Sequence, residues 1–123
     1  MSIMRPEGVP VTIGGKEYKL YFTLNAIDKI QTEYGRSISD LADILGNSVT
    51  GIGAQRFVLT ALVNEGLDYA ADDTGIKSPH IAEDYVGRHV LDNMRPKDIL
   101  QAIYAAFVAH NQSETDDPNP ESE

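Results

Sequence analysis

The chain contains no cysteine, which excludes a disulfide scaffold, a cysteine nucleophile and a cysteine-ligated zinc site. It contains no tryptophan, and many of its six tyrosines and three phenylalanines stand at core spacing, which argues against a base-stacking platform. No apolar run approaches the roughly 18 residues that span a membrane, and residues 1–10 lack the apolar segment of a secretory signal. We therefore expect a cytoplasmic protein without a membrane partner.

Basic residues are few: ten Lys and Arg stand against nineteen Asp and Glu, for a net charge of −9. A duplex-binding surface needs clustered positive charge, and these ten residues are scattered, so we expect no nucleic-acid partner. Five of the acidic residues fall in the last eleven positions, SETDDPNPESE, a composition typical of a disordered tail. An alternative use of the acidity is that of a nucleic-acid mimic that inhibits a nucleic-acid-binding protein.

The length of 123 residues predicts one domain with a buried core that needs neither a disulfide nor a metal. We expect an irregular lead-in at residues 1–10, a single hairpin-plus-helical domain at residues 11–111 and a disordered acidic tail at residues 112–123. No cofactor is expected, because the sequence lacks a phosphate-binding loop, a GxSxG motif and a dinucleotide-binding turn.

The hairpin is predicted by apolar residues that alternate with polar ones on both sides of Gly14-Gly15. These residues are Val11 and Ile13 before the glycines, and Tyr18, Leu20 and Phe22 after them. A two-residue turn pairs Val11 with Tyr18 and puts both apolar sets on one face, whereas a three-residue loop would send them to opposite faces. We expect two antiparallel strands, with a loop and a lone strand as the alternative.

A helix is predicted directly after the second strand. Thr23 is placed to cap its N-terminus, and Gly35 suits the left-handed conformation that ends a helix. Apolar residues recur between them at helical spacing: Leu24, Ile27, Ile30 and Tyr34.

The segment IGGKEYKLYFTLNAIDKIQTEYG resembles the opening of small tail assembly chaperones of long-tailed bacteriophages and gene transfer agents. Members of that family begin with a GGKxYxL strand, which is matched here by Gly14, Gly15, Lys16, Tyr18 and Leu20. An xxNAxxxxExxYG helix follows in the family, and it is matched here by Asn25, Ala26, Tyr34 and Gly35. The chain departs from the pattern at Ile30-Gln31, where a Glu is expected, and the resemblance covers about residues 10–110.

The resemblance implies a non-catalytic protein that binds the tape measure protein, the long helical protein of the phage tail, and keeps its apolar surface from aggregating. It also implies that the protein assists assembly of the tail tube, with the tube protein as a second partner. Such a protein acts in the cytoplasm of the infected or lysogenic bacterial cell and is absent from the mature virion. These expectations come from the resemblance and not from composition or spacing.

Four further helices and two loops are predicted downstream. The helices are expected at residues 37–45, 54–67, 78–92 and from Pro96 to about residue 111. The loops are expected at residues 47–53 and 68–77. The fold class is therefore mainly α (α+β), with an N-terminal β-hairpin packed on a bundle of about five helices.

The third and fifth predicted helices carry more apolar surface than a small core readily covers. Leu59 and Val63 lie off the main apolar side of the third helix, and Tyr104 and Val108 lie at the edge of the apolar stripe of the fifth. Because an exposed apolar patch usually marks a binding surface, we predict that these four residues bind a partner. The alternatives are self-association through the same surface and complete burial of that surface in the bundle.

His80, Glu83 and Asp84 are the closest approach to a metal site, since His80 and Asp84 would share a helix face at i and i+4. A small metal-dependent enzyme built on these three residues is a second alternative function. The plainer interpretation is a first helical turn whose acids favour the helix dipole, because no second His stands at ligand spacing. We therefore predict no catalytic residue and no metal site.

Overall fold

The computed structural model describes residues 8–115, with side chains described to residue 110. It contains an N-terminal β-hairpin packed on five α-helices, as predicted. Residues 1–7 and 116–123, which hold most of the predicted lead-in and tail, lie outside the described residues. The elements are β1 (Val9–Ile13), β2 (Lys16–Leu20), α1 (Leu24–Tyr34), η1 (Ile38–Asp40), α2 (Leu41–Gly46), α3 (Gly51–Thr74), α4 (Glu83–His89), η2 (Val90–Asp92) and α5 (Pro96–Thr115).

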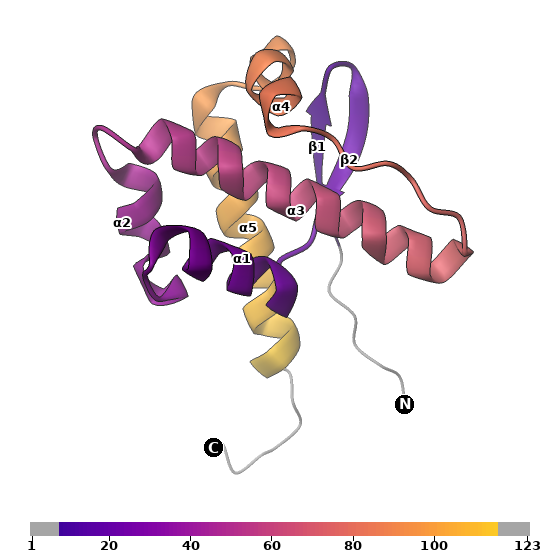
Figure 1. Cartoon of the computed structure of the whole chain (residues 1–123), viewed down its shortest axis with the longest axis horizontal. Helices are drawn as coiled ribbons and strands as arrows, with labels where there is room; N and C mark the ends of the chain where they lie inside the picture. The colour runs from indigo at the N-terminus through magenta and orange to yellow at the C-terminus, as the bar shows by residue number, and fades with distance from the viewer. Residues whose placement is uncertain (1–7, 116–123) are drawn as a thin grey trace.

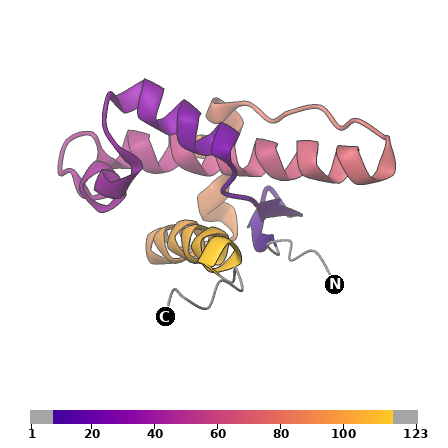
Figure 2. The ribbon, with the colours of Figure 1, turned by 90° about the horizontal axis from the view of Figure 1, so that it is seen from below.

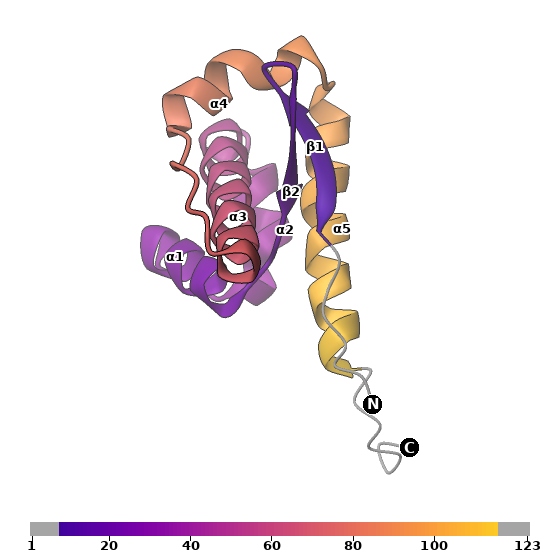
Figure 3. The ribbon, with the colours of Figure 1, turned by 90° about the vertical axis from the view of Figure 1, so that its right-hand side faces the viewer.

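The long helix α3 crosses the middle of the molecule and contacts β2 and the other four α-helices (Figure 1). Figures 2 and 3 show two layers, with α1, α2 and α3 on one side and the hairpin with α5 on the other. The hairpin contacts α3 through β2 and contacts α5 through both strands. At the end where the hairpin turn lies, α4 and η2 connect the two layers (Figure 3).

The hairpin has the predicted register, in which Val11 pairs with Tyr18 across a two-residue turn. Both turn residues have a positive φ, 62° at Gly14 and 81° at Gly15, as a type I′ turn requires. The inward-facing residues of both strands are buried, as their alternation predicts: Val11, Ile13, Tyr18 and Leu20.

The hairpin turn is fixed to the corner between α4 and α5. The N–H of Gly15 donates to Oδ1 of Asn93 at 3.0 Å. A Cβ at Gly14 would collide with the Tyr85 hydroxyl, and the positive φ of this residue also favours glycine at that position. The tip of the hairpin is therefore positioned by side chains that stand far along the chain.

The helix α1 begins and ends as predicted. Oγ1 of Thr23 accepts the N–H of Ala26 at 3.2 Å, and Gly35 ends the helix with a φ of 63°. The predicted apolar stripe is only partly correct, because Leu24 is 73% exposed while Ile30 is fully buried.

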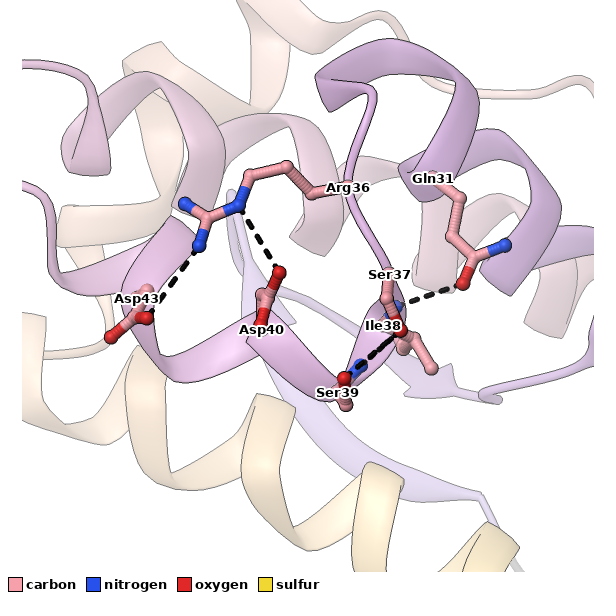
Figure 4. Close-up of polar contacts among 7 residues, drawn as sticks. All are labelled: Gln31, Arg36, Ser37, Ile38, Ser39, Asp40 and Asp43. Carbon is pink, nitrogen blue, oxygen red and sulfur yellow. Dashed lines mark hydrogen bonds and ion pairs between the residues drawn. The ribbon is translucent and has the colours of Figure 1, made fainter.

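The predicted helix at residues 37–45 is divided into the 3₁₀ turn η1 and the short helix α2. The Ser37 hydroxyl caps the 3₁₀ turn, and the amide oxygen of Gln31 accepts the N–H of Ile38 at 2.8 Å (Figure 4). Arg36 forms exposed ion pairs with two residues of this corner, Asp40 and Asp43 (Figure 4). Local polar contacts thus favour a corner at the place where a single helix was expected.

The helix α3 spans Gly51–Thr74 and is longer at both ends than the predicted residues 54–67. The predicted loops at both of its ends are therefore partly wrong, because the glycines of residues 47–53 and the polar composition of residues 68–77 were taken as signs of a loop. Glycine costs about 1 kcal/mol relative to Ala within a helix, but tertiary packing overrides that preference here. A Cβ at Gly66 would collide with the carbonyl oxygen of Lys19, so this glycine lets β2 approach the helix backbone closely.

The predicted helix at residues 78–92 is wrong in its first part, because α4 begins only at Glu83 and is followed by η2. Residues 78–82 instead run back along α3. The side-chain amide of Asn64 on α3 accepts the N–H of Ile81 at 2.9 Å and donates to its carbonyl at 3.1 Å. These two bonds hold the segment in a non-helical conformation. Residues 75–82 are called the strap below.

The helix α5 begins at Pro96, as predicted, and continues to Thr115, past the predicted boundary at residue 111. Four alanines of this helix, Ala102, Ala105, Ala106 and Ala109, lie opposite its bulky apolar residues. However, Ala102 and Ala106 are 8% and 3% exposed, so part of that face packs inside the molecule.

The core is centred on the first half of α3. This half contributes five apolar residues that are at most 1% exposed: Ala54, Val58, Leu59, Leu62 and Val63. Every buried side-chain nitrogen or oxygen in the described part of the chain has a hydrogen-bond partner. The core is therefore apolar, and the buried polar side-chain atoms beside it are hydrogen-bonded.

Candidate functional site

An apolar groove lies between the first half of α3, α4 with η2, and the start of α5. It has a volume of about 160 Å³ and is called the α3–α5 groove below. Its lining is apolar except for two side chains from α3: Ile52, Gln55, Arg56, Leu59, Val86, Gly87, Val90, Leu91, Pro96 and Ile99.

The floor and the rim of the α3–α5 groove differ in exposure. The floor is formed by core residues at most 7% exposed: Leu59, Val86, Val90 and Ile99. On the rim, Ile52 of α3 is 74% exposed and Leu91 of η2 is 59% exposed. Large apolar side chains around an apolar cavity are typical of a surface that a partner covers.

One wall of the groove depends on a glycine. The aliphatic part of Arg56 lies against Gly87 of α4, where a Cβ would stand only 2.8 Å from Cδ of the arginine. Beyond this contact, Nε of Arg56 binds Oε2 of Glu83 at 2.9 Å. This hydrogen bond, together with the negative charge of Glu83, raises the pKa of Arg56 above its usual value.

A second depression lies on the other side of Arg56. It is shallower, has a volume of about 310 Å³, and is lined by more polar groups, with Glu33 and Glu83 among them. Tyr34 lines it as well, and burial raises the pKa of its hydroxyl. Polar and apolar groups line this depression about equally, whereas the α3–α5 groove is mostly apolar, so the groove is the better candidate for binding an apolar partner.

The four predicted partner-binding residues do not form one surface. Leu59 and Val63 are 1% and 0% exposed, which corrects the expectation that they lie on a free flank of α3. The reason is that α3 is covered from several sides, and a helical wheel does not show how many neighbours a helix has. Leu59 does line the floor of the α3–α5 groove, and Val108 is 50% exposed on α5. Tyr104 is partly buried.

Two of the three residues of the metal alternative, His80 and Glu83, have separate partners. Nε2 of His80 lies 2.9 Å from Oδ1 of Asp68, while Glu83 binds Arg56 on a different part of α3. His80 stands in the strap, so the predicted i, i+4 relation with Asp84 on a helix is wrong. Within residues 8–115, the structure brings together no group of three or more His, Asp or Glu side chains suited to a metal ion.

No protein-family model, curated protein or solved structure matches the chain. Among the described helices, none is long and apolar enough to cross a membrane.

Sequence reasoning missed the groove residues for identifiable reasons. Ile52 stands between two glycines and was taken as part of a loop, and Leu91 falls off the buried stripe of the fourth predicted helix. A usable signal was nevertheless present. A large apolar residue inside a polar, glycine-containing stretch, such as Val49 or Ile52, has no core to join and indicates a surface role.

Proposed function

We propose that this chain is a non-catalytic tail assembly chaperone, which binds the tape measure protein and assists assembly of the tail tube. It acts in the cytoplasm of the bacterial host and leaves before the virion is complete. The observation that carries the proposal is the α3–α5 groove, with its apolar floor and the exposed Ile52 and Leu91 on its rim. The resemblance of residues 13–35 to the opening of that family supplies the identity of the partner.

The groove fits one apolar side chain of a partner helix. Its volume of about 160 Å³ is close to that of an engineered cavity of about 150 Å³ that binds benzene. An amphipathic helix binds such grooves through anchors at i, i+3, i+4 and i+7. In this arrangement, one Leu or Phe enters the groove while the neighbouring anchors rest on Ile52 and Leu91.

A small groove also suits a partner that must be released. One buried anchor and a few rim contacts leave little surplus after the entropic cost of association, so the complex is weak and reversible. A chaperone needs this property, because tail tube subunits must later replace it on the tape measure protein.

Co-expression with the cognate tape measure protein tests the proposal. We expect the wild-type chain to keep that protein in the soluble fraction and to co-purify with it. The double variant Ile52→Asp/Leu91→Asp should lose both effects, because two carboxylates would have to be desolvated at the interface. The matched control is Ile76→Asp, since Ile76 is 72% exposed but does not line the groove. An insoluble tape measure protein in the presence of the wild-type chain would overturn the proposal.

A further inference from the structure

The α3–α5 groove has an unusual charge for this molecule. The chain carries a net charge of −9, yet the only charged side chain that lines the groove is the cation Arg56. No carboxylate is among the lining residues. Arg56 is already paired with Glu83, and Asp84 lies close enough to act on it, so an anionic group beside an apolar anchor would meet the remaining N–H donors of the guanidinium rather than a net positive charge.

The guanidinium of Arg56 has capacity for a further ligand. It carries five N–H donors, and within residues 8–110 its hydrogen bond through Nε to Glu83 is the one the structure shows. The side chain is 46% exposed, so the donors on its two terminal nitrogens are accessible. A carboxylate binds such a planar fork more specifically than it binds a lysine ammonium.

The position of this guanidinium is set before any ligand arrives. The stem of Arg56 rests on Gly87, and Glu83 holds Nε, so the side chain is restrained at both places. A restrained side chain loses less conformational entropy on binding than a mobile one. Gly87 therefore has a role in recognition, although it has no side chain of its own.

We propose that Arg56 makes the α3–α5 groove selective for a partner helix that carries a carboxylate about one turn from its apolar anchor. This inference rests on the proposed function, because it specifies the chemistry of the helix that the groove accepts. A second copy of this chain is a poorer occupant, since two molecules of net charge −9 repel each other during association.

Two synthetic helical peptides test this selectivity. Both carry the same leucine stripe at i, i+3, i+4 and i+7, and they differ only in a Glu or a Lys one turn from the central leucine. Binding to the full chain is measured by isothermal titration calorimetry at low salt. We expect the Glu peptide to bind about fivefold more tightly, which is the range of a partly exposed ion pair. Equal affinities, or no binding of either peptide, would overturn the inference.

Charge reversal provides the decisive variant. Arg56→Glu should invert the preference, so that the Lys peptide binds more tightly. Arg36→Glu is the matched control, because Arg36 is 43% exposed and also paired with carboxylates but lies in the α1–α2 corner. It should leave the preference unchanged. An unaltered ratio of affinities in Arg56→Glu, with the fold verified by circular dichroism, would contradict the proposal.

The role of Gly87 is tested separately. Gly87→Ala should reduce the preference for the Glu peptide, because the new methyl group displaces the arginine stem. In Gly53→Ala, an added Cβ on α3 meets nothing within 4 Å, and the preference should remain. Selectivity retained in Gly87→Ala would show that the glycine contact does not position Arg56.

The outcomes separate this inference from the proposed function. If the peptides are distinguished but the tape measure protein is not bound, the proposed function fails and the selectivity of the groove stands. If the tape measure protein is bound but the peptides are not distinguished, only the selectivity fails. A concentration-dependent dimer in sedimentation velocity that Ile52→Asp dissociates would identify a second copy as the occupant and overturn the inference.

Discussion

The two halves of α3 have different environments, although they form one continuous helix. Gly51–Val63 is enclosed by other elements and supplies the centre of the core. Residues 67–74 contain no fully buried side chain, and this end of the helix projects beyond most of the molecule (Figure 1). The first half is therefore held by tertiary packing, and the second by β2, the strap and its own backbone bonds. We expect local stability to fall along the helix.

The largest effect should come from truncating the enclosed half. Leu62 is 0% exposed, and Leu62→Ala should lower the free energy of unfolding by about 2–5 kcal/mol through lost burial and a residual cavity. Leu67→Ala removes the same atoms from a partly buried position and should cost only about 1 kcal/mol. Urea denaturation measures both, and equal losses would show that the two halves are packed alike.

Gly66 lies where β2 approaches α3, and its substitution should have the second-largest effect on the free energy of unfolding. Gly66→Ala favours helix locally, but its methyl group would meet the backbone of Lys19 and should cost about 1–3 kcal/mol. Gly53→Ala meets no neighbour and should stabilise the protein by up to about 1 kcal/mol. Thermal unfolding measures whether each variant is less or more stable than the wild type. A stabilised Gly66→Ala variant would mean that the strand does not press on the helix.

Breaking the contact between the strap and α3 should lower local stability only in the strap and in residues 67–74, the end of α3 that projects. Asn64→Ala removes both bonds to the backbone of Ile81 and should cost about 1–3 kcal/mol. Hydrogen exchange of the Ile81 amide should accelerate, with no comparable change at Val58. His80→Ala breaks an exposed contact with Asp68 and should cost less than about 1 kcal/mol. Unchanged exchange at Ile81 in Asn64→Ala would contradict the assigned role of the strap.

The smallest effect on stability is expected at the exposed residue of the enclosed half. Ile52→Ser should change the free energy of unfolding by less than about 0.5 kcal/mol, because Ile52 is 74% exposed. Chemical denaturation measures this change, and binding of the leucine-stripe peptides should weaken in the same variant. A loss of several kcal/mol would place Ile52 in the core and remove it from the groove rim.

The features that the sequence predicted correctly are those encoded within a few residues. The register of the hairpin follows from Gly14-Gly15 and the alternation around it, and the limits of α1 follow from Thr23 and Gly35. Each of these signals acts on its immediate neighbours. For this reason they are readable without knowledge of the tertiary structure.

The features that were missed depend on residues distant in the chain. The close approach of β2 to α3 at Gly66 involves the backbone of Lys19, and the late start of α4 depends on Asn64 binding Ile81. The groove was missed because it forms only where three separate elements meet. Only Leu59 among the predicted partner-binding residues lines it.

The contact between the hairpin turn and the α4–α5 corner has a consequence for synthesis on the ribosome. Gly15 is among the first described residues to emerge, but its partner Asn93 stands 78 positions later. The hairpin therefore cannot reach its final position until that residue has left the exit tunnel. Its apolar face can pack on α3 earlier, but until that helix has emerged the face is open to other nascent chains, because an isolated two-stranded hairpin is at best marginally stable.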